Sequence, residues 1–452
     1  MDYDLKSLDG KSGCCVAYEQ HKCKGRIRTS NNNEASIILG HPTEHNHAPE
    51  PGKVVARHIA QVVATRASQT VEATRQIIQK SRTGIPLDAA IFLPSYRSSQ
   101  RTIQRKRKQE NAPWPNPNHL SEINVPENLR FTTRNESFLI YDSGSNDANR
   151  ITLFSTTANI NLMASCENWF MDGTFSVAPR LFYQVYTIHA LKSNKVLLLV
   201  YALMTNKTQL NYTRMFEELL RQQPNLNPQT IMMDFEKGAM NAVSTEFCNA
   251  TVKGCFFHLN QSIWKKIKET SNLPDLYLNN DEIRTILKSL MALAFVPVDD
   301  VITAFLALLD LSNDYPELDD VFAYFEDTYI GRARGERRLR PRYSIQCWNV
   351  YDRVISHLPH THNAIEGWHR AFQNSIACNH PTVYSLINQF RTEQDFVELI
   401  LQRIRAGEEF PQFSSQIYAK VSERIERVVE QYNNLPILDY LRGVAHNLNF
   451  LD

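Results

Sequence analysis

Hydrophobic and polar positions divide the chain into a short amino-terminal part and a long remainder with a different pattern. Residues 13–48 lack a helical repeat and are rich in Cys, His and Asn, which predicts a small β-rich unit. Apolar residues then recur at helical spacing over residues 53–80, with a break near residue 69, and predict two helices. A third helix is expected over residues 98–109, before the proline-rich stretch 111–119 that marks a linker.

Beyond the linker, strand patterns replace helical ones. Two apolar runs, residues 138–141 and 150–154, are separated by the turn-rich sequence DSGSNDAN and predict a β-hairpin. Three further strands are predicted over residues 169–176, 182–189 and 196–204. The turns between these three are short, so we expect antiparallel neighbours.

After these strands the pattern alternates between helix and strand. Helices are predicted over residues 212–221 and 237–247, and strands over residues 230–234 and 251–256. Antiparallel strands followed by alternating helices and strands indicate an α/β fold with a mixed sheet. Residues 261–355 are predicted to be an α-helical insertion, and the remainder of the chain predicts helices broken by prolines.

Composition excludes several classes of protein. The 452 residues are 42% hydrophobic and 21% charged, near the globular averages, and this length suggests two to four domains. No apolar run is long enough for a membrane span and the first residues lack a secretory signal, so we expect neither membrane insertion nor secretion. The sequences GxGxxG, GxSxG, HExxH and a complete P-loop are all missing. Eight cysteines indicate intracellular thiols or metal ligands rather than a disulfide scaffold.

Charge is distributed unevenly along the chain. Residues 1–110 carry 18 Lys and Arg against 10 Asp and Glu, a net charge of +8, whereas the other 31 basic and 38 acidic residues give −7. This asymmetry is typical of a nucleic-acid-facing module joined to a larger body, although a basic segment can also be a solvated face. The basic run in this part consists of Arg97, Arg101, Arg105, Lys106, Arg107 and Lys108. It can contact phosphate, serve as a nuclear import signal, or form a solvated helix face.

A second basic segment lies in the loop of residues 331–342. Only Glu336 opposes its guanidinium groups within the loop, and we expect the loop to lie along a DNA backbone. The six arginines are Arg332, Arg334, Arg337, Arg338, Arg340 and Arg342.

Two aspartates occupy strand positions that favour a metal site. Asp172 lies within the apolar run WFMDGTF, where a carboxylate is costly unless it is paired or bound to metal, and the alternative is a strand-end residue facing solvent. Asp234 ends the strand IMMD and precedes a helix, so it lies at the strand edge where α/β sheets bind ligands, or else caps the helix. With a third acid on a later helix, these two would suit a site for two Mg²⁺ ions.

The third acid comes from the sequence HNAIEGWHR, which contains Glu366. Together with FMDGTFSVAP, IMMDFEKGAMNA and GCFFHLN, this motif resembles the transposase domain of the MULE (Mutator-like element) family over roughly residues 135–400. The resemblance implies an RNase H-like core with a helical insertion, in which Asp172, Asp234 and Glu366 form a DDE metal-binding triad. It also implies Mg²⁺ or Mn²⁺ as cofactor. One motif alone would be weak, but four in the right order are specific.

A Cys-x2-His pair, Cys255 and His258, follows the last core strand, where the same family has a CxxH signature. Two ligands do not close a zinc site, so core packing of Cys255 and a structural hydrogen bond from His258 are at least as well supported as metal binding. His369 lies three residues after Glu366 on the same helix face. We expect His369 to pack rather than to contact substrate.

The amino-terminal unit contains its own set of ligands: Cys15, Cys23, His45 and His47. Two Cys and two His within 33 residues suit a closed structural Zn²⁺ site, and an unmetallated loop is the alternative. If residues 44–48 are extended, both histidines point to one face, whereas Cys14 faces away from Cys15. This unit resembles a FLYWCH-type zinc finger, but Ser12 and Gly13 stand where that module has Tyr-Trp, which leaves its completeness open.

We therefore predict an α/β chain with an RNase H-like mixed sheet and an α-helical insertion, preceded by a small β-rich zinc unit and a basic helical segment. The predicted function is a DDE-type transposase that cleaves and joins double-stranded DNA, with a domesticated DNA-binding regulator as the alternative. We also expect a homo-oligomer located in the nucleus. The predicted parts are 1–50 zinc finger, 51–110 basic helices, 111–130 linker, 131–260 and 356–400 catalytic core, 261–355 insertion and 401–452 C-terminal helices.

Overall fold

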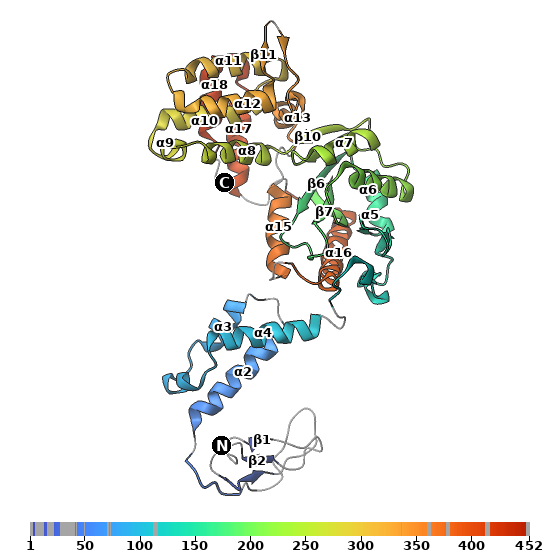
Figure 1. Ribbon diagram of the computed structural model, residues 1–452, viewed down its shortest axis with the longest axis vertical. Coiled ribbons are helices and arrows are strands. Elements are labelled where there is room, and N and C mark those ends of the chain that lie inside the picture. The colour runs from blue at the N-terminus through green and yellow to red at the C-terminus, as the bar shows by residue number, and fades with distance from the viewer. Residues whose placement is uncertain are drawn as a thin grey trace. The chain divides into compact units, whose positions relative to one another are not determined.

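The computed structural model describes residues 3–4, 13–15, 22–27, 41, 43–48, 50–69, 72, 74–111, 116–335, 337–358, 363–376, 380–411 and 416–448. The chain forms two compact units, Met1–Pro115 and Asn116–Asp452 (Figure 1). In the part of the chain that is described, no helix is long and apolar enough to cross a membrane.

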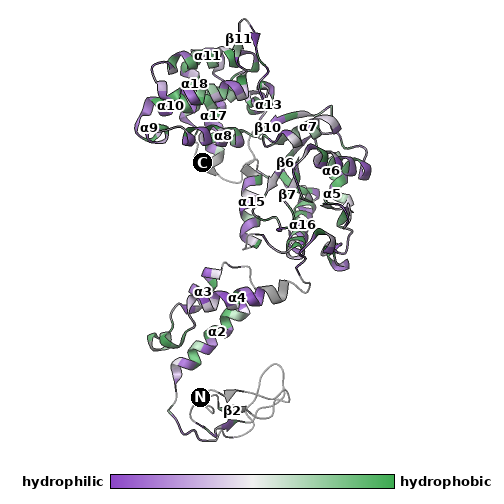
Figure 2. Cartoon of the chain, viewed as in Figure 1, coloured by the Kyte–Doolittle hydropathy of each residue, from purple (hydrophilic) through white to green (hydrophobic). Residues whose placement is uncertain are grey.

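In its described residues the first unit contains a small antiparallel sheet and three helices, as the sequence predicted. The sheet has the order β1-β2-β3, with strands β1 (Tyr3–Asp4), β2 (Gly13–Cys15) and β3 (Arg26–Ile27). The helices are α2 (Pro51–Gln69), α3 (Thr74–Arg82) and α4 (Tyr96–Asn111), with a 3-10 turn η1 (Leu87–Phe92). Their core is a small aliphatic cluster that includes Ile59, Val63, Ile77 and Ile103. Figure 2 shows the hydrophilic colour of most of α4.

The second unit is built on a seven-stranded mixed sheet with the order β10-β9-β6-β7-β8-β5-β4. The strands are β4 (Leu139–Asp142), β5 (Ile151–Phe154), β6 (Asn168–Thr174), β7 (Gln184–Lys192), β8 (Lys195–Met204), β9 (Thr230–Met233) and β10 (Thr251–Gly254). Strands β6, β9 and β10 run parallel, and the others pair antiparallel. The predicted hairpin and the predicted mixed sheet are both confirmed.

Helices cover both faces of this sheet (Figure 1). One face packs against α5 (Thr157–Ala164), α6 (Gln209–Gln222) and α7 (Lys237–Glu246), through contacts such as Trp169 with Phe247 and Tyr186 with Tyr212. The other face packs against α15 (Asn363–Ile376) and α16 (Val383–Arg405). Residues of β6 alternate between the two faces, because successive side chains of a strand point in opposite directions.

A helical body follows β10. It contains α8 (Phe256–Glu269), α9 (Leu273–Asn279), α10 (Asp281–Ala292), α11 (Val301–Ser312), α12 (Asp319–Phe325), α13 (Ile345–Trp348) and α14 (Tyr351–Ile355). Between α12 and α13 lies a hairpin of β11 (Ala333–Arg334) and β12 (Arg337–Arg338). The C-terminal helices α17 (Gln416–Val429) and α18 (Ile437–His446) pack on this same body, α18 against α10 and α11.

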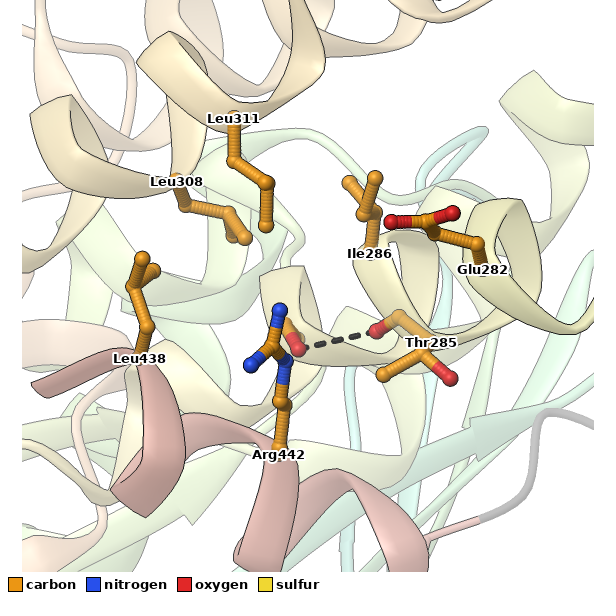
Figure 3. Close-up of a pocket in the computed structure, with 8 residues that line it drawn as sticks. Glu282, Thr285, Ile286, Leu308, Leu311, Leu438 and Arg442 are labelled. Atoms are coloured by element: carbon orange, nitrogen blue, oxygen red, sulfur yellow. Dashed lines mark hydrogen bonds between the residues drawn. The ribbon is translucent and has the colours of Figure 1, made fainter.

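Short turns complete the second unit. They are the 3-10 turns Leu120–Glu122, Glu127–Leu129, Leu293–Phe295, Val298–Asp300, Pro316–Leu318 and Tyr432–Asn434, and the π turn Glu326–Ile330. A small hollow between α10, α11 and α18 is lined by Ile286, Leu308, Leu438 and Arg442 among others (Figure 3). Its lining includes none of the acids singled out in the sequence, so it lies apart from the candidate site.

Candidate functional site

The first unit brings the four predicted zinc ligands together. One ligand atom each from Cys15, Cys23, His45 and His47 lies within 4.8 Å of the others. The Cys15 Sγ atom is 3.2 Å from His47 Nε2, and the Cys23 Sγ atom is 3.4 Å from His45 Nδ1. The two ring nitrogens are 3.3 Å apart. The ligand atoms of a tetrahedral zinc site are separated by roughly 3.3–3.8 Å, so this cluster fits a zinc ion.

Local features hold this cluster in place. Residues 44–48 are not a strand, because a bend covers Asn46 and His47, yet both histidines reach the cluster. His47 Nδ1 lies 2.9 Å from the carbonyl of Ala48, the kind of contact that fixes the ring of a metal-bound histidine. A Cβ atom at Gly25 would come within 2.8 Å of the His45 ring, so this close approach requires glycine. The side chain of Cys14 lies outside the described residues.

In the second unit, Asp172 is a buried carboxylate on the α15 face of the sheet. Only 4% of the residue is exposed, which rules out the alternative of a strand-end aspartate facing solvent. It pairs with Thr187 across β6 and β7, and one carboxylate oxygen accepts a hydrogen bond from the Gly173 backbone N–H at 2.8 Å. No cation balances this charge among the contacts described for it.

Asp234 follows β9 and is level with Asp172. Phe170 of β6 pairs with Met232 of β9 in parallel register, so the residues two positions further along each strand are adjacent and share a face. Asp234 is not the N-cap of α7, since Glu236 occupies that position. The alternative capping role is therefore wrong.

Helix α15 lies on the same face because an apolar cluster attaches it there. Ile365 packs with Phe170, Met232 and Cys255, all of them buried. Further along the helix, the Trp368 indole contacts His189 of β7 and donates a hydrogen bond to Glu393 of α16 at 3.0 Å. These contacts bury Cys255 in the cluster and place the neighbouring Glu366 beside the acidic residues.

The first turns of α15 add a carboxylate and an imidazole to the acidic centre. Ligand atoms of Asp172, Glu366 and His369 all lie within 4.8 Å of one another. His369 Nδ1 is 3.3 Å from Asp172 Oδ2, and His258 Nε2 of α8 is 3.8 Å from Glu366 Oε1. His369 Nε2 is buried and has no hydrogen-bond partner among the described residues. We call Asp172, Asp234, Glu366 and His369 the acidic centre.

The surroundings of the acidic centre disfavour the ionised form of its carboxyl groups. Burial raises the pKa of Asp172 well above its usual value, and the charges of Asp234 and Glu366 raise it further. Burial and the neighbouring Glu236 raise the pKa of Asp234 to about 6, against an opposing effect of Lys207. Mutual repulsion of carboxylates in a buried site is the arrangement that a bound cation relieves.

The two histidines respond to burial in the opposite direction. Burial lowers the pKa of His258 to about 4. Burial and the adjacent His258 lower the pKa of His369 to about 4 as well. Both imidazoles are therefore neutral near pH 7, and a neutral ring nitrogen is the form that can bind a metal ion.

The basic segments differ in how much of their charge is available. Arg97, Arg101 and Arg105 are exposed and spaced by four residues along one face of α4. Arg107 instead donates to the carbonyls of Ala67 and Glu72 and so ties α4 to α2 and to the segment that precedes α3. Lys106 is partly buried, and the side chain of Lys108 lies outside the described residues.

The arginine-rich loop is a hairpin with two of its charges already paired. Arg332 forms an ion pair with Asp327, and Arg338 forms one with Glu326 at 2.7 Å. Glu336 is the one acid within residues 331–342, and the preceding π turn supplies two more carboxylates from outside the loop. Arg334, Arg337, Arg340 and Arg342 are exposed.

Sequence reasoning missed three members of this region. His369 was expected to pack, although its i+3 spacing from Glu366 was the signal that it shares a face with that acid. Glu236 and Lys207, which act on Asp234, lie in loop positions where no local pattern marks them.

Comparison with protein families identifies part of this unit. Residues 168–262 match the family model of the MULE transposase domain, so this part of the chain is similar to that domain. The match includes Asp172, Asp234, Cys255 and His258 and ends before α15. None of the curated proteins matches the chain.

Proposed function

We propose that this chain is a DDE-type DNA transposase of the MULE class, in which Asp172, Asp234 and Glu366 hold divalent metal ions for cleavage of DNA ends and strand transfer. One observation carries the proposal. Two adjacent parallel strands and a helix from far along the sequence contribute carboxylates to one face of the sheet, where burial and the neighbouring acids raise the pKa of Asp172. A protein gains nothing in stability from such an arrangement, so a functional reason is needed.

The topology agrees with this function. Three antiparallel strands, β6 to β8, followed by β9 and β10 parallel to β6 in the order β10-β9-β6-β7-β8, support an RNase H-like core. The helical body between β10 and α15 agrees with the insertion that the MULE resemblance implies. The position of Glu366 just after that body favours it as the third acid.

The donor atoms favour a hard divalent cation. Carboxylate oxygens are preferred ligands of Mg²⁺ and Mn²⁺, and His369 adds one nitrogen beside Asp172. A pair of such ions, when bound, activates the attacking oxygen and neutralises the leaving oxygen of a phosphodiester. The apolar cluster beneath the acids fixes the backbone of β6, β9 and α15, and so holds the carboxylates in position.

The first unit is proposed to bind the DNA substrate. Its Cys and His cluster would hold structural Zn²⁺ in a FLYWCH-type finger, and the exposed arginines of α4 would contact phosphates of double-stranded DNA. We also propose that the protein works in the nucleus, and that it acts as a homo-oligomer because two DNA ends are joined.

A cleavage assay tests the proposal. The substrate is a duplex that carries the inverted repeats flanking the gene, incubated with the full-length protein and Mg²⁺ or Mn²⁺. Asp172→Asn, Asp234→Asn and Glu366→Gln should each lower cleavage by on the order of 10³-fold or more, because each removes a charge that holds metal. Binding of the same duplex should stay within about threefold, because phosphate contacts come from cationic groups elsewhere.

The matched control is Glu218→Gln in α6. Glu218 is a buried carboxylate, 7% exposed, that pairs with Arg221 outside the acidic centre, so its removal should leave cleavage unchanged. A wild-type protein that binds the repeats but never cuts them with either metal would favour the domesticated DNA-binding regulator instead.

A further inference from the structure

An exposed aromatic pair lies beside the acidic centre. Phe175 and Tyr183 are each 46% exposed, and their rings contact each other edge to face with centroids 5.3 Å apart. Among the exposed large apolar side chains of the described residues, these are the two aromatic ones that contact each other. An isolated exposed aromatic residue is ordinary on a protein surface, but a contacting pair next to buried carboxylates marks a binding surface.

The strand that carries Asp172 also positions this pair. Phe175 comes directly after β6, three residues beyond Asp172, a separation of roughly 10 Å along an extended chain. Tyr183 comes directly before β7, and its backbone N–H donates to the carbonyl of Met204 at 2.8 Å. Both rings therefore project from the end of the sheet that carries the acids.

A lysine lies over the aromatic pair. The Lys207 Nζ atom lies 5.8 Å from the ring centroid of Phe175 and 5.7 Å from that of Tyr183. One ammonium group thus faces both rings.

The backbone holds Lys207 in this place. A Cβ atom at Gly238, in the first turn of α7, would lie 2.9 Å from the Lys207 carbonyl oxygen, so the loop packs tightly on that helix. The Asn206 side-chain oxygen accepts two hydrogen bonds from Thr208, one from its backbone N–H at 3.1 Å and one from its side-chain hydroxyl at 2.8 Å. The loop is therefore built to present its lysine and needs little rearrangement to bind a ligand.

We propose that Phe175, Tyr183 and Lys207 form a platform for an unpaired nucleotide of the DNA substrate, with its base stacked on the rings and its phosphate against the ammonium group. This inference rests on the proposed function and adds a substrate feature to it. Aromatic rings stack on the face of a base, and that face is accessible only when the base has left the duplex. A lysine over both rings favours a ligand with an anionic group beside a flat one, which describes a nucleotide better than an apolar peptide.

The test measures binding without cleavage, in EDTA-free buffer with Ca²⁺ in place of Mg²⁺. The probes are a fluorescent duplex with a short single-stranded 3′ extension and a blunt duplex of the same sequence. Phe175→Ala with Tyr183→Ala should weaken binding of the extended probe by about 5- to 100-fold, the usual effect of losing base stacking. Binding of the blunt probe should change less than about twofold.

Three variants make the result specific. The conservative pair Phe175→Tyr with Tyr183→Phe keeps both rings and should bind the extended probe as wild type does. Phe396→Ala removes an aromatic side chain that is 61% exposed on α16, and should leave binding of both probes unchanged. Lys207→Ala should weaken binding of the extended probe and make this binding less dependent on salt concentration.

Two results would overturn the platform. One is an alanine pair that binds the extended probe as tightly as wild type, and the other is an equal loss for both probes, which would indicate a general contact with duplex DNA. Because no cutting is needed, the outcome is separate from the transposase proposal. If the wild type never cleaves DNA, but the alanine pair still loses binding of the extended probe alone, the platform is supported and the enzymatic function is not.

Discussion

The Cys and His cluster of the first unit and the acidic centre of the second unit are both groups of metal-ligand residues, but the chain assembles them differently. Cys15 and His47 are 32 residues apart, and their sheet has strands of only two or three residues. Asp172 and His369 are 197 residues apart and are joined by a seven-stranded sheet with helices on both faces. The first cluster has little apolar core of its own, whereas the second belongs to a core that exists without it.

The two sites differ in whether the metal stabilises the fold or the fold assembles the metal site. In a small unit with little core, ligand binding supplies the folding free energy, roughly 10–16 kcal/mol for structural zinc in isolated fingers. In the acidic centre the fold instead holds carboxyl groups close together, although burial and mutual repulsion disfavour their ionised forms. We infer that the first unit needs its metal in order to fold, and that the fold of the second unit forms its metal site before any metal binds.

Removal of zinc should have the largest effect, and this effect should be confined to the first unit. Chelation of the full-length protein should abolish the hydrogen-exchange protection of β2 and β3, because the Cys and His cluster holds these strands. The second unit should keep its melting temperature within about 2 °C, because its core is independent of the metal.

Cys23→Ser should reproduce the effect of chelation, while Cys248→Ser, an exposed cysteine elsewhere, should have none. Equal protection of β2 and β3 with and without zinc would show that the cluster is an unmetallated loop.

The pH dependence of the metal-free second unit should show a smaller effect. The pKa of Asp234 is raised to about 6 from its ordinary value of 3.8. A carboxyl group with a raised pKa in the folded state contributes stability below its unfolded pKa, and this contribution disappears as the pH rises through about 6. Its full size is roughly 3 kcal/mol at most.

Thermal melts in EDTA should therefore show wild type losing stability between pH 4 and 6 relative to Asp234→Asn, which cannot ionise. Parallel curves for the two proteins over this range would contradict the burial and repulsion that distinguish the acidic centre from the zinc cluster.

The smallest expected effect concerns the exposed arginines of the first unit. Alanine at Arg97, Arg101 and Arg105 together should reduce the slope of log affinity against log salt by about 2 to 3 for duplex DNA, one counterion per lost phosphate contact. The comparison variant is Arg107→Ala, which removes contacts to two backbone carbonyls. It should lower the stability of the three helices more than it changes the salt slope. An unchanged slope in the triple variant would return this face to the solvated or nuclear-import interpretation.

The sequence predicted the sheet well because strand patterns are local. Runs of apolar residues identified β6, β7 and β8, with the largest error at the end of β7, predicted at residue 189 and found at Lys192, and the position of Asp234 at a strand end followed from the same pattern. The ligand types and spacing of the Cys and His cluster also sufficed, because that cluster is assembled within one short segment.

The missed features depend on approach between distant segments. Glu366 was identified only through resemblance to a family, and the meeting of α15 with β6 rests on Ile365 and Trp368, which no local pattern pairs with Phe170 or His189. Phe175 fell within the predicted strand 169–176, and its exposure could not be known from an apolar run. Lys207 lies in a loop whose closeness to Asp234 depends on the packing of α7.

The most direct test of the central claim is a titration of zinc-loaded, full-length protein with Mn²⁺, followed by electron paramagnetic resonance. We predict that wild type binds Mn²⁺ at a site distinct from the zinc cluster. Glu366→Gln should weaken this binding at least tenfold, whereas Glu218→Gln should bind Mn²⁺ as wild type does. Equal Mn²⁺ binding by wild type and Glu366→Gln would contradict the proposed metal site.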